Sequence, residues 1–193
     1  MTPANDPRVQ RTRRCAIEST LHLLCTQGYS GVTFEAVSQY SGIARSTLYR
    51  QWPTTSELIH DALDSIVEPA TPRETGDLQT DLRQLLGHIQ RKLTATSWGA
   101  LLPAIVDAGA RDPHIAEFQR QYSEQRRLIA HAIAKRGIES GQFPDDADVD
   151  LVAEQLIGPI FFRFLVSHQP IDNAYIDRLY SSVITPLFDE PNA

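Results

Sequence analysis

The stretch of residues 33–60 constrains the fold of this chain more than any other part of it. Phe34 and Val37 lie one helical turn apart, and Gly42 then provides the backbone freedom that ends a helix. A second apolar-periodic segment follows, and Pro53 ends it because a proline disfavours helix in the residue before it. The pattern predicts two short helices joined by a tight turn, the arrangement that can place a helix in the major groove of DNA.

Each of these two helices has an expected beginning, and the second has an expected outer face. Thr33 is expected to cap the first helix and Ser46 the second, since both side chains accept hydrogen bonds from free amides. The outward side chains of the second helix are hydrogen-bonding groups: Arg45, Ser46, Thr47, Tyr49, Arg50 and Gln51. Arginine binds guanine edges, glutamine binds adenine, and hydroxyls suit phosphates. The alternative is an ordinary helical corner with a solvated polar face.

Residues 10–60 resemble the DNA-binding domain of the TetR family of bacterial transcriptional regulators. The matching residues are Gly28-Tyr29, Thr33, Val37, Gly42-Ile43, Ser46-Thr47-Leu48-Tyr49 and Glu57-Leu58. The resemblance implies a three-helix head whose contacts with double-stranded DNA come from Thr33, Arg45, Ser46, Thr47, Tyr49, Arg50 and Gln51. Thr55 departs from the family pattern, which usually has a lysine here. Its hydroxyl and the nearby helix amides can still bind a phosphate, but one counterion-releasing charge is lost.

Charge is divided unevenly along the chain. The net charge of −6 argues by itself against a nucleic-acid partner. Residues 1–60 nevertheless carry six arginines against four acidic residues, a net charge of +2, which leaves −8 for residues 61–193. A basic head on an acidic body suits a DNA-binding protein, although a solvated charged surface would look similar. The resemblance would let Arg11, Arg13 and Arg14 approach the DNA backbone, and solvated surface arginines are the alternative.

The sequence indicates a cytoplasmic protein. It has no run of about 18 apolar residues that could span a membrane. Its polar, basic start at residues 1–14 is unlike a signal peptide. Cys15 and Cys25, the only cysteines, are expected on one helix about 15 Å apart, which is too far for a disulfide. Two separate thiols fit a reducing compartment.

Helical periodicity continues beyond the head and predicts an all-α fold of about nine helices. Besides the two short ones, helices are expected near residues 8–27, 54–67, 78–93, 98–110, 113–137, 149–166 and 172–188. Residues 1–7 are expected to form a disordered arm. The Pro-rich break at residues 68–76 marks a change of organisation. We expect two domains, at residues 1–60 and 61–193. The resemblance implies that the first is a helix-turn-helix DNA-binding domain and that the second is a helical ligand-sensing and dimerisation domain.

The last two expected helices are apolar on more than one face, so each must bury more than one face. In a chain of this size the second face is expected to meet another copy. The resemblance implies the same homodimer, in which two helices from each subunit form a four-helix bundle and two heads bind a palindromic operator. The expected interface residues are Leu156, Ile160, Leu165, Tyr175, Leu179, Val183 and Leu187.

The resemblance also implies that the body binds a small molecule whose binding lowers operator affinity. The expected lining residues are Trp98, Leu101, Leu102, Ile105, Phe118, Tyr122, Gln125, Phe161 and Phe164. Their mostly apolar character indicates a hydrophobic or aromatic ligand, with Trp98, Tyr122 and Gln125 as polar handles. Each of these residues can equally be ordinary core, and Phe161 can belong to the dimer interface.

The sequence offers little for catalysis or metal binding. Its six histidines are scattered, and the acidic run Asp145, Asp146, Asp148 and Asp150 lacks the glycine and glutamate of a calcium loop. We interpret these carboxylates as helix caps. No catalytic residue, cofactor or metal is therefore expected, and the expected function is a transcriptional repressor. The alternatives are a helical small-molecule-binding or enzymatic protein whose helix-turn-helix is only structural, and a ligand-independent regulator or an activator.

Overall fold

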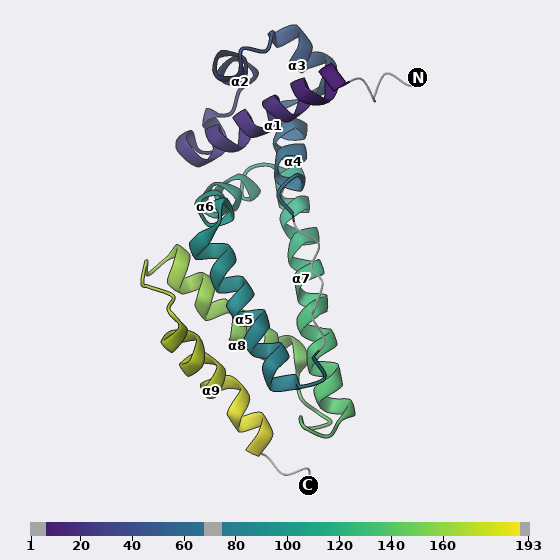
Figure 1. The fold of residues 1–193 in the computed structure, drawn as a ribbon, viewed down its shortest axis with the longest axis vertical. Helices are drawn as coiled ribbons and strands as arrows, with labels where there is room; N and C mark the ends of the chain where they lie inside the picture. The colour runs from purple at the N-terminus through teal and green to yellow at the C-terminus, as the bar shows by residue number, and fades with distance from the viewer. Residues whose placement is uncertain (1–6, 68–74, 190–193) are drawn as a thin grey trace. The chain divides into compact units, whose positions relative to one another are not determined.

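The computed structural model describes residues 7–67 and 75–189, and within these ranges the chain forms nine α-helices, one short 3₁₀ turn and no strand (Figure 1). The elements are α1 (Pro7–Gln27), η2 (Tyr29–Gly31), α2 (Phe34–Ser41), α3 (Arg45–Gln51), α4 (Thr55–Asp64), α5 (Leu78–Ala95), α6 (Ser97–Gly109), α7 (Pro113–Glu139), α8 (Val149–Leu165) and α9 (Asn173–Asp189). The expected all-α fold is confirmed. The expected arm at residues 1–7 lies, apart from Pro7, outside the described residues, as does most of the break at 68–76.

The chain divides into two compact units. The first unit comprises residues 1–68 and 100–121, and the second unit comprises residues 69–99 and 122–193. Helices α6 and α7 contribute to both units. The boundary expected between residues 60 and 61 falls inside α4 and stays a prediction.

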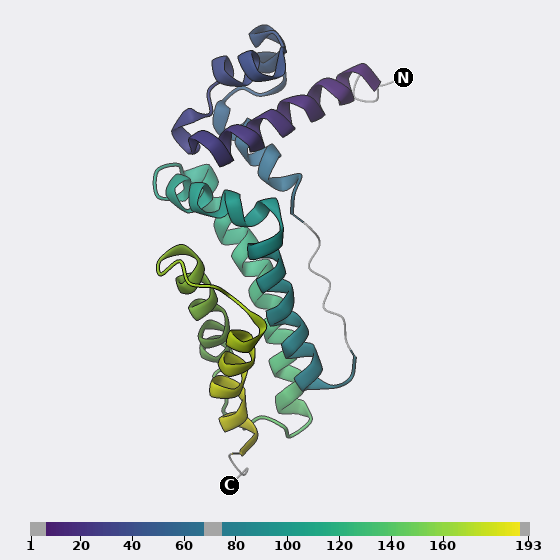
Figure 2. The ribbon, with the colours of Figure 1, turned by 60° about the vertical axis from the view of Figure 1, so that its left-hand side comes forward.

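In the first unit, α1 contacts α2 and α4, and α2 contacts α3. Fully buried side chains from these helices form the core, among them Ala16, Val37, Leu48 and Leu58. Their burial stabilises the short helices, which are too short to be stable in isolation. In Figures 1 and 2 these helices lie together, with α1 crossing beside the α2–α3 pair.

The turn between α2 and α3 has the expected form. The Thr33 side chain accepts a hydrogen bond from the amide of Ala36 at 3.0 Å and so caps α2. Gly42 ends α2 in the left-handed conformation, with φ of 74°, which only glycine adopts at no steric cost.

The expected start of α3 was wrong. Ala44, not Ser46, is the N-cap residue, and it makes no side-chain cap. The reason is that the Ala44 carbonyl already accepts hydrogen bonds from the amides of Thr47 and Leu48, at 2.9 and 3.3 Å, so the first turn closes before Ser46. Ser46 is consequently an exposed residue inside the helix.

In the second unit, α5 contacts α8 and α9, and α8 contacts α9. Both ribbon views show α8 and α9 side by side (Figures 1 and 2). The core between them includes Leu86, Ile160 and Ile184, all fully buried. Helix α7 continues through Gly137, its expected end, to Glu139. A β-carbon at Gly137 would lie only 2.6 Å from the ring of Phe143, so this glycine permits close packing inside the helix and does not end it.

No helix in the described part of the chain is long and apolar enough to cross a membrane. Cys15 and Cys25 are both free thiols, as their expected separation on one helix requires.

Candidate nucleic-acid interface

Helix α3 separates its side chains into a buried face and a polar outer face. Leu48 is fully buried, and Trp52, the residue that follows the helix, is 3% exposed. The outer face is formed by exposed residues and by two half-buried ones: Arg45, Ser46, Tyr49 and Arg50, then Thr47 and Gln51. The division expected from helical periodicity is therefore present, and both arginines of the helix are exposed. That arrangement suits contacts with base edges and phosphates.

Three neighbouring residues shape this surface. The ring of Tyr49 packs on that of Phe34, with 4.4 Å between centroids, which restricts the position of the phenol although Tyr49 is 58% exposed. Thr33 is exposed at the start of α2. Thr55 lies half-buried in the first turn of α4, where Thr54 is the side chain that caps the helix by accepting from the amide of Glu57 at 3.2 Å.

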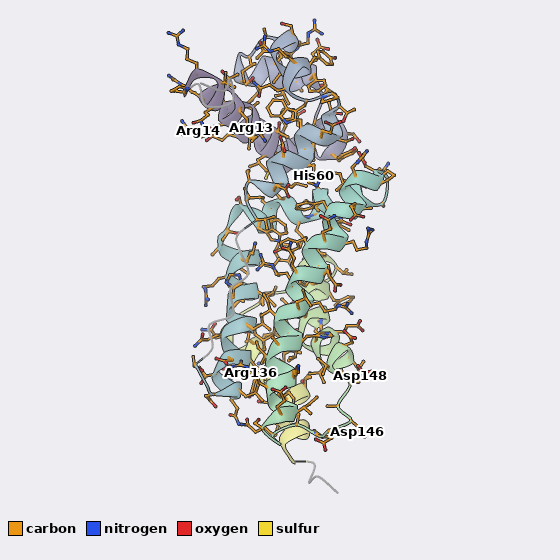
Figure 3. All side chains as sticks on the ribbon, turned by 90° about the vertical axis from the view of Figure 1, so that its right-hand side faces the viewer. Arg13, Arg14, His60, Arg136, Asp146 and Asp148 are labelled. Carbon is orange, nitrogen blue, oxygen red and sulfur yellow. The ribbon has the colours of Figure 1, made fainter. Side chains whose placement is uncertain are left out.

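A carboxylate on α4 fixes the end of α3, and sequence reasoning missed it. One oxygen of Asp61 accepts hydrogen bonds from the indole N–H of Trp52 and from the guanidinium of Arg13, both at 2.6 Å. The Arg13 guanidinium also lies 5.8 Å from the centre of the Trp52 ring. Arg13 thus links α1, α4 and the end of α3. Arg14, the other residue labelled on α1 in Figure 3, lies 3.8 Å from Glu18.

A second carboxylate, Asp112, joins three other segments of the first unit. One of its oxygens accepts the amide of His114 at 2.8 Å and so caps the start of α7. The other accepts the hydroxyls of Tyr29 and Ser56. Burial alone would raise the pKa of Asp112, but the hydrogen bonds from Ser56 and Tyr29 outweigh it and hold the pKa below its usual value. Burial, with the hydrogen bond to Asp112, raises the pKa of Tyr29.

Two of the expected ligand-lining residues meet in the second unit. The rings of Trp98 and Tyr122 stack with 4.6 Å between centroids and 28° between planes. The ammonium of Lys92, a residue only 9% exposed, lies 4.5 Å from the centre of the Trp98 ring and 5.3 Å from that of Tyr122. The guanidinium of Arg126 lies 4.8 Å from the Tyr122 ring centre. Sequence reasoning missed both cations, because a lysine and an arginine on amphipathic helices carry no signal of ring contact.

The other expected lining residues are spread over both units. Leu101, Leu102, Ile105 and Phe118 are buried residues of the first unit. Phe161 and Phe164 are half-buried in the second unit, where the Phe164 ring lies close to Gly99. Gln125 is exposed on α7 and is not among the buried polar groups.

The residues expected at a dimer interface divide by burial. Leu156, Ile160 and Leu179 are buried inside the protomer, so their side chains pack within one chain. Leu165, Tyr175 and Val183 are half-buried, and the side chain of Leu187 lies outside what the structure describes. Large apolar side chains that α8 and its end do expose are Leu151, Phe162 and Val166, at 49%, 59% and 61%. Phe162 also lines a surface hollow together with Pro159, Arg163, Ser167 and Tyr175.

One residue of the acidic run before α8 forms the expected helix cap. Asp148, labelled in Figure 3, caps α8 by accepting the amide of Leu151 at 3.0 Å. Asp150 accepts from Arg127 at 3.0 Å and lies 2.6 Å from a ring nitrogen of His131. The contact with His131 and the charge of Arg127 lower the pKa of Asp150. Across residues 7–67 and 75–189, no three metal-binding side chains gather into a group.

A short helix pair around Gly42, with a polar outer face on α3, defines a helix-turn-helix DNA-binding protein. Residues 16–62 match the model of the tetR family of bacterial regulatory proteins, and residues 72–183 match the tetracyclin repressor-like C-terminal domain. The chain belongs to the TetR family of transcriptional regulators.

Similar proteins carry the same description. The chain is 25% identical over 178 residues to the uncharacterized HTH-type transcriptional regulator YdeS of Bacillus subtilis, covering 90% of this chain and 88% of that protein. It is 27% identical over 180 residues to the DNA-binding transcriptional repressor TetR of Mycobacteroides abscessus, covering 91% and 94%. The crystal structure of the TetR-family transcription regulator SCO0332 matches with a TM-score of 0.64 and 30% identity, covering 91% of this chain and 97% of that one.

Proposed function

We propose that this TetR-family regulator is a repressor that binds a palindromic operator as a homodimer and is released by a small, mostly apolar ligand. The observation that carries the proposal is the outer face of α3, where Arg45 and Arg50 are exposed on a helix whose Leu48 is fully buried. Exposed guanidinium groups on a rigidly held helix are suited to reading guanine edges in the major groove. We take the role to be non-catalytic and its place to be the cytoplasm, where the operator is.

The DNA-binding surface comprises α3 and the starts of the helices on either side of it. Arg45, Ser46, Thr47, Tyr49, Arg50 and Gln51 face the major groove, while Thr33 and Thr55 meet phosphates. The exposed start of α2 at Thr33 supports a phosphate contact, because helix N-terminal amides attract anions. With threonine in place of lysine at position 55, the surface carries one less charge for the DNA backbone.

The homodimer interface runs over the exposed side of α8 and α9. The exposed apolar residues Leu151, Phe162 and Val166 support it, since monomers rarely leave such side chains together in water. Half-buried Leu165, Tyr175 and Val183 are available to the same interface. Two copies related by a two-fold axis would present two α3 helices to the two halves of a palindrome.

The small-molecule effector binds beside the Trp98–Tyr122 ring pair of the second unit. Stacked rings favour a flat apolar ligand. Because Lys92 and Arg126 hold cations on these rings, the effector also carries an acidic group. Release requires that the effector bind the free conformation more tightly than the DNA-bound one.

Selection of bound duplexes from a random DNA library, with the full chain at about 0.1 M salt, tests the proposal. We expect enrichment of a palindrome whose half-sites are centred one turn of DNA apart, or a multiple of one turn, so that both α3 helices of a two-fold dimer meet the same side of the duplex. An enriched sequence without two-fold symmetry would contradict the proposal that a homodimer binds the operator. No enrichment, with only weak salt-sensitive binding, would favour the alternative in which the helix-turn-helix is only structural and the chain is a helical small-molecule-binding or enzymatic protein.

A further inference from the structure

The carboxylate of Asp112 is buried and both of its oxygens are engaged. The residue is 9% exposed and stands immediately before α7. One oxygen caps α7 through the amide of His114, and the other accepts the two hydroxyls of Tyr29 and Ser56. Burying a carboxylate is costly unless strong hydrogen bonds compensate. A cap needs only one acceptor oxygen, and serine or asparagine provides it as well as aspartate does. The second oxygen therefore has a different role.

The two hydroxyl donors bracket the helix-turn-helix in the sequence. Tyr29 lies in η2, directly before α2, and Ser56 lies in the first turn of α4, directly after α3. Residues 34–51, which form α2 and α3, thus lie between two points that are bound to one carboxylate oxygen. The hydroxyls themselves lie only 3.5 Å apart. Asp112 therefore holds both ends of the segment that carries the DNA-binding surface.

The ring and apolar contacts next to this carboxylate do not fix the orientation of α4 on α7. One turn further along α4, the His60 ring meets the Phe118 ring of α7 edge-on, at 5.6 Å and 78° (Figure 3 labels His60). Ile115, in the first turn of α7, is fully buried. Apolar burial is non-directional and tolerates small shifts, whereas a hydrogen bond to a charged oxygen weakens steeply with angle. The hydrogen bonds, and not the ring contact, set the register of α4 on α7.

We propose that Asp112 is a positioning residue for operator binding, which fixes both ends of the helix-turn-helix on the start of α7 through the hydroxyls of Tyr29 and Ser56. It touches no DNA. Loss of the Asp112 carboxylate leaves the side chains of α3 unchanged but no longer fixes the orientation of the helix. Affinity should therefore fall most for the duplex whose half-site spacing fits the wild-type protein best. This inference rests on the operator binding proposed above.

The test compares Asp112→Ser with Asp148→Ser in the full chain. Serine keeps the cap at either site, but it has no second oxygen. Asp148 is the matched control, because the structure gives its side chain the cap of α8. Affinity is measured for the selected duplex and for the same duplex with one base pair added or removed between the half-sites. We expect Asp112→Ser to bind the selected duplex about tenfold more weakly and to discriminate less between spacings, while Asp148→Ser matches the wild type.

The spacing ratio separates positioning from stability. A variant that is merely less stable loses active protein equally for all three duplexes, and its ratio stays that of the wild type. The double variant Tyr29→Phe, Ser56→Ala removes the donors and leaves Asp112 in place, so it decides the matter if Asp112→Ser does not fold. Ser56→Thr keeps a hydroxyl and should retain wild-type binding. Wild-type affinity and wild-type ratio in both Asp112→Ser and the double variant would overturn the proposal.

Amide hydrogen exchange on the free protein provides a readout that needs no DNA. We expect faster exchange of the amides of residues 34–51 in Asp112→Ser than in Asp148→Ser. Equal exchange in the two variants would contradict the positioning role. If the wild type binds no duplex at all, operator binding itself fails, whereas the exchange comparison still decides whether Asp112 positions these helices.

Discussion

Two regions of the molecule fix their charged side chains in different ways. One is the set of residues around α3, and the other is the Trp98–Tyr122 ring pair. Around α3, Asp61 and Asp112 each use one oxygen to accept two side-chain donors from other segments. At the ring pair, Lys92 and Arg126 lie over aromatic faces. Hydrogen bonds to a charged oxygen define an angle, whereas a cation over a ring tolerates displacement. The first arrangement suits a surface that must match DNA, and the second suits the effector site that we propose beside the rings.

The largest effect should come from removing the acceptor beside α3. Asp61→Ala leaves the indole N–H of Trp52 and the Arg13 guanidinium without their shared oxygen. We expect the free energy of unfolding to fall by about 2 kcal/mol, toward the lower part of the range for bonds to charged groups, because Asp61 is partly exposed. Denaturant titration measures this. Asp64→Ala, on the same helix, is the control, and an equal change in both variants would show that the Asp61 network has no special role.

The next effect concerns binding and should leave folding unchanged. Arg45 is exposed at the start of α3, so Arg45→Ala should cost about 1–3 kcal/mol of operator binding and relax specificity at one base pair. Its unfolding midpoint should match that of the wild type. Arg91→Ala is the matched control, because Arg91 is an exposed arginine on α5 of the second unit. Competition with single-base variants of the operator measures both results, and unchanged specificity in Arg45→Ala would remove this residue from the reading surface.

A smaller effect should appear in acid. Because the pKa of Asp112 is lowered on folding, its contribution to stability is complete above the usual carboxyl value of 3.8 and is lost as the pH falls through the lower, folded value. Asp112→Ser should therefore lose less stability than the wild type when the pH is lowered from about 5 to about 3. Unfolding curves at several pH values measure the slope. An identical slope in the two proteins would mean that Asp112 contributes nothing through its charge.

The smallest effect should come from the ring pair. Lys92→Met keeps an unbranched side chain of similar length over the rings and removes the cation. We expect the loss of the cation–ring contact to lower the free energy of unfolding by about 1 kcal/mol. Binding of 2-naphthoate, measured by calorimetry, should weaken relative to that of neutral 2-naphthamide. A loss of stability in Lys92→Met as large as that in Asp61→Ala would show that the cation over the rings is as important for folding as the hydrogen bonds of Asp61.

Short-range signals in the sequence predicted the fold around α3 well. Thr33 and Gly42 act on residues within one turn, so their roles follow from residue type. Ser46 was wrongly predicted to be the N-cap of α3, because the first residue of a helix depends on the conformation of the turn before it. The carbonyl of Ala44 already accepts the first hydrogen bonds of α3. The buried and exposed sides of α3 followed from periodicity alone.

Long-range partners could not be predicted in the same way. The cap formed by Asp112 is local, but its hydroxyl donors come from 83 and 56 residues away. The same limit applies to α8 and α9. The sequence predicted that they bury more than one face, but it did not predict that Leu156, Ile160 and Leu179 pack inside this chain. Periodicity identifies an apolar face, whereas tertiary packing decides what covers it.

The two tryptophans of this chain give it a built-in pair of optical reporters. Trp52 belongs to the first unit, where its indole N–H is bound to a carboxylate, and Trp98 belongs to the second unit, where its ring is stacked on a tyrosine beneath an ammonium. Such different surroundings should give the two indoles distinct emission spectra and quenching. Replacing either one with phenylalanine leaves a single emitter, so DNA and small molecules can each be followed at a chosen end of the chain without an attached dye.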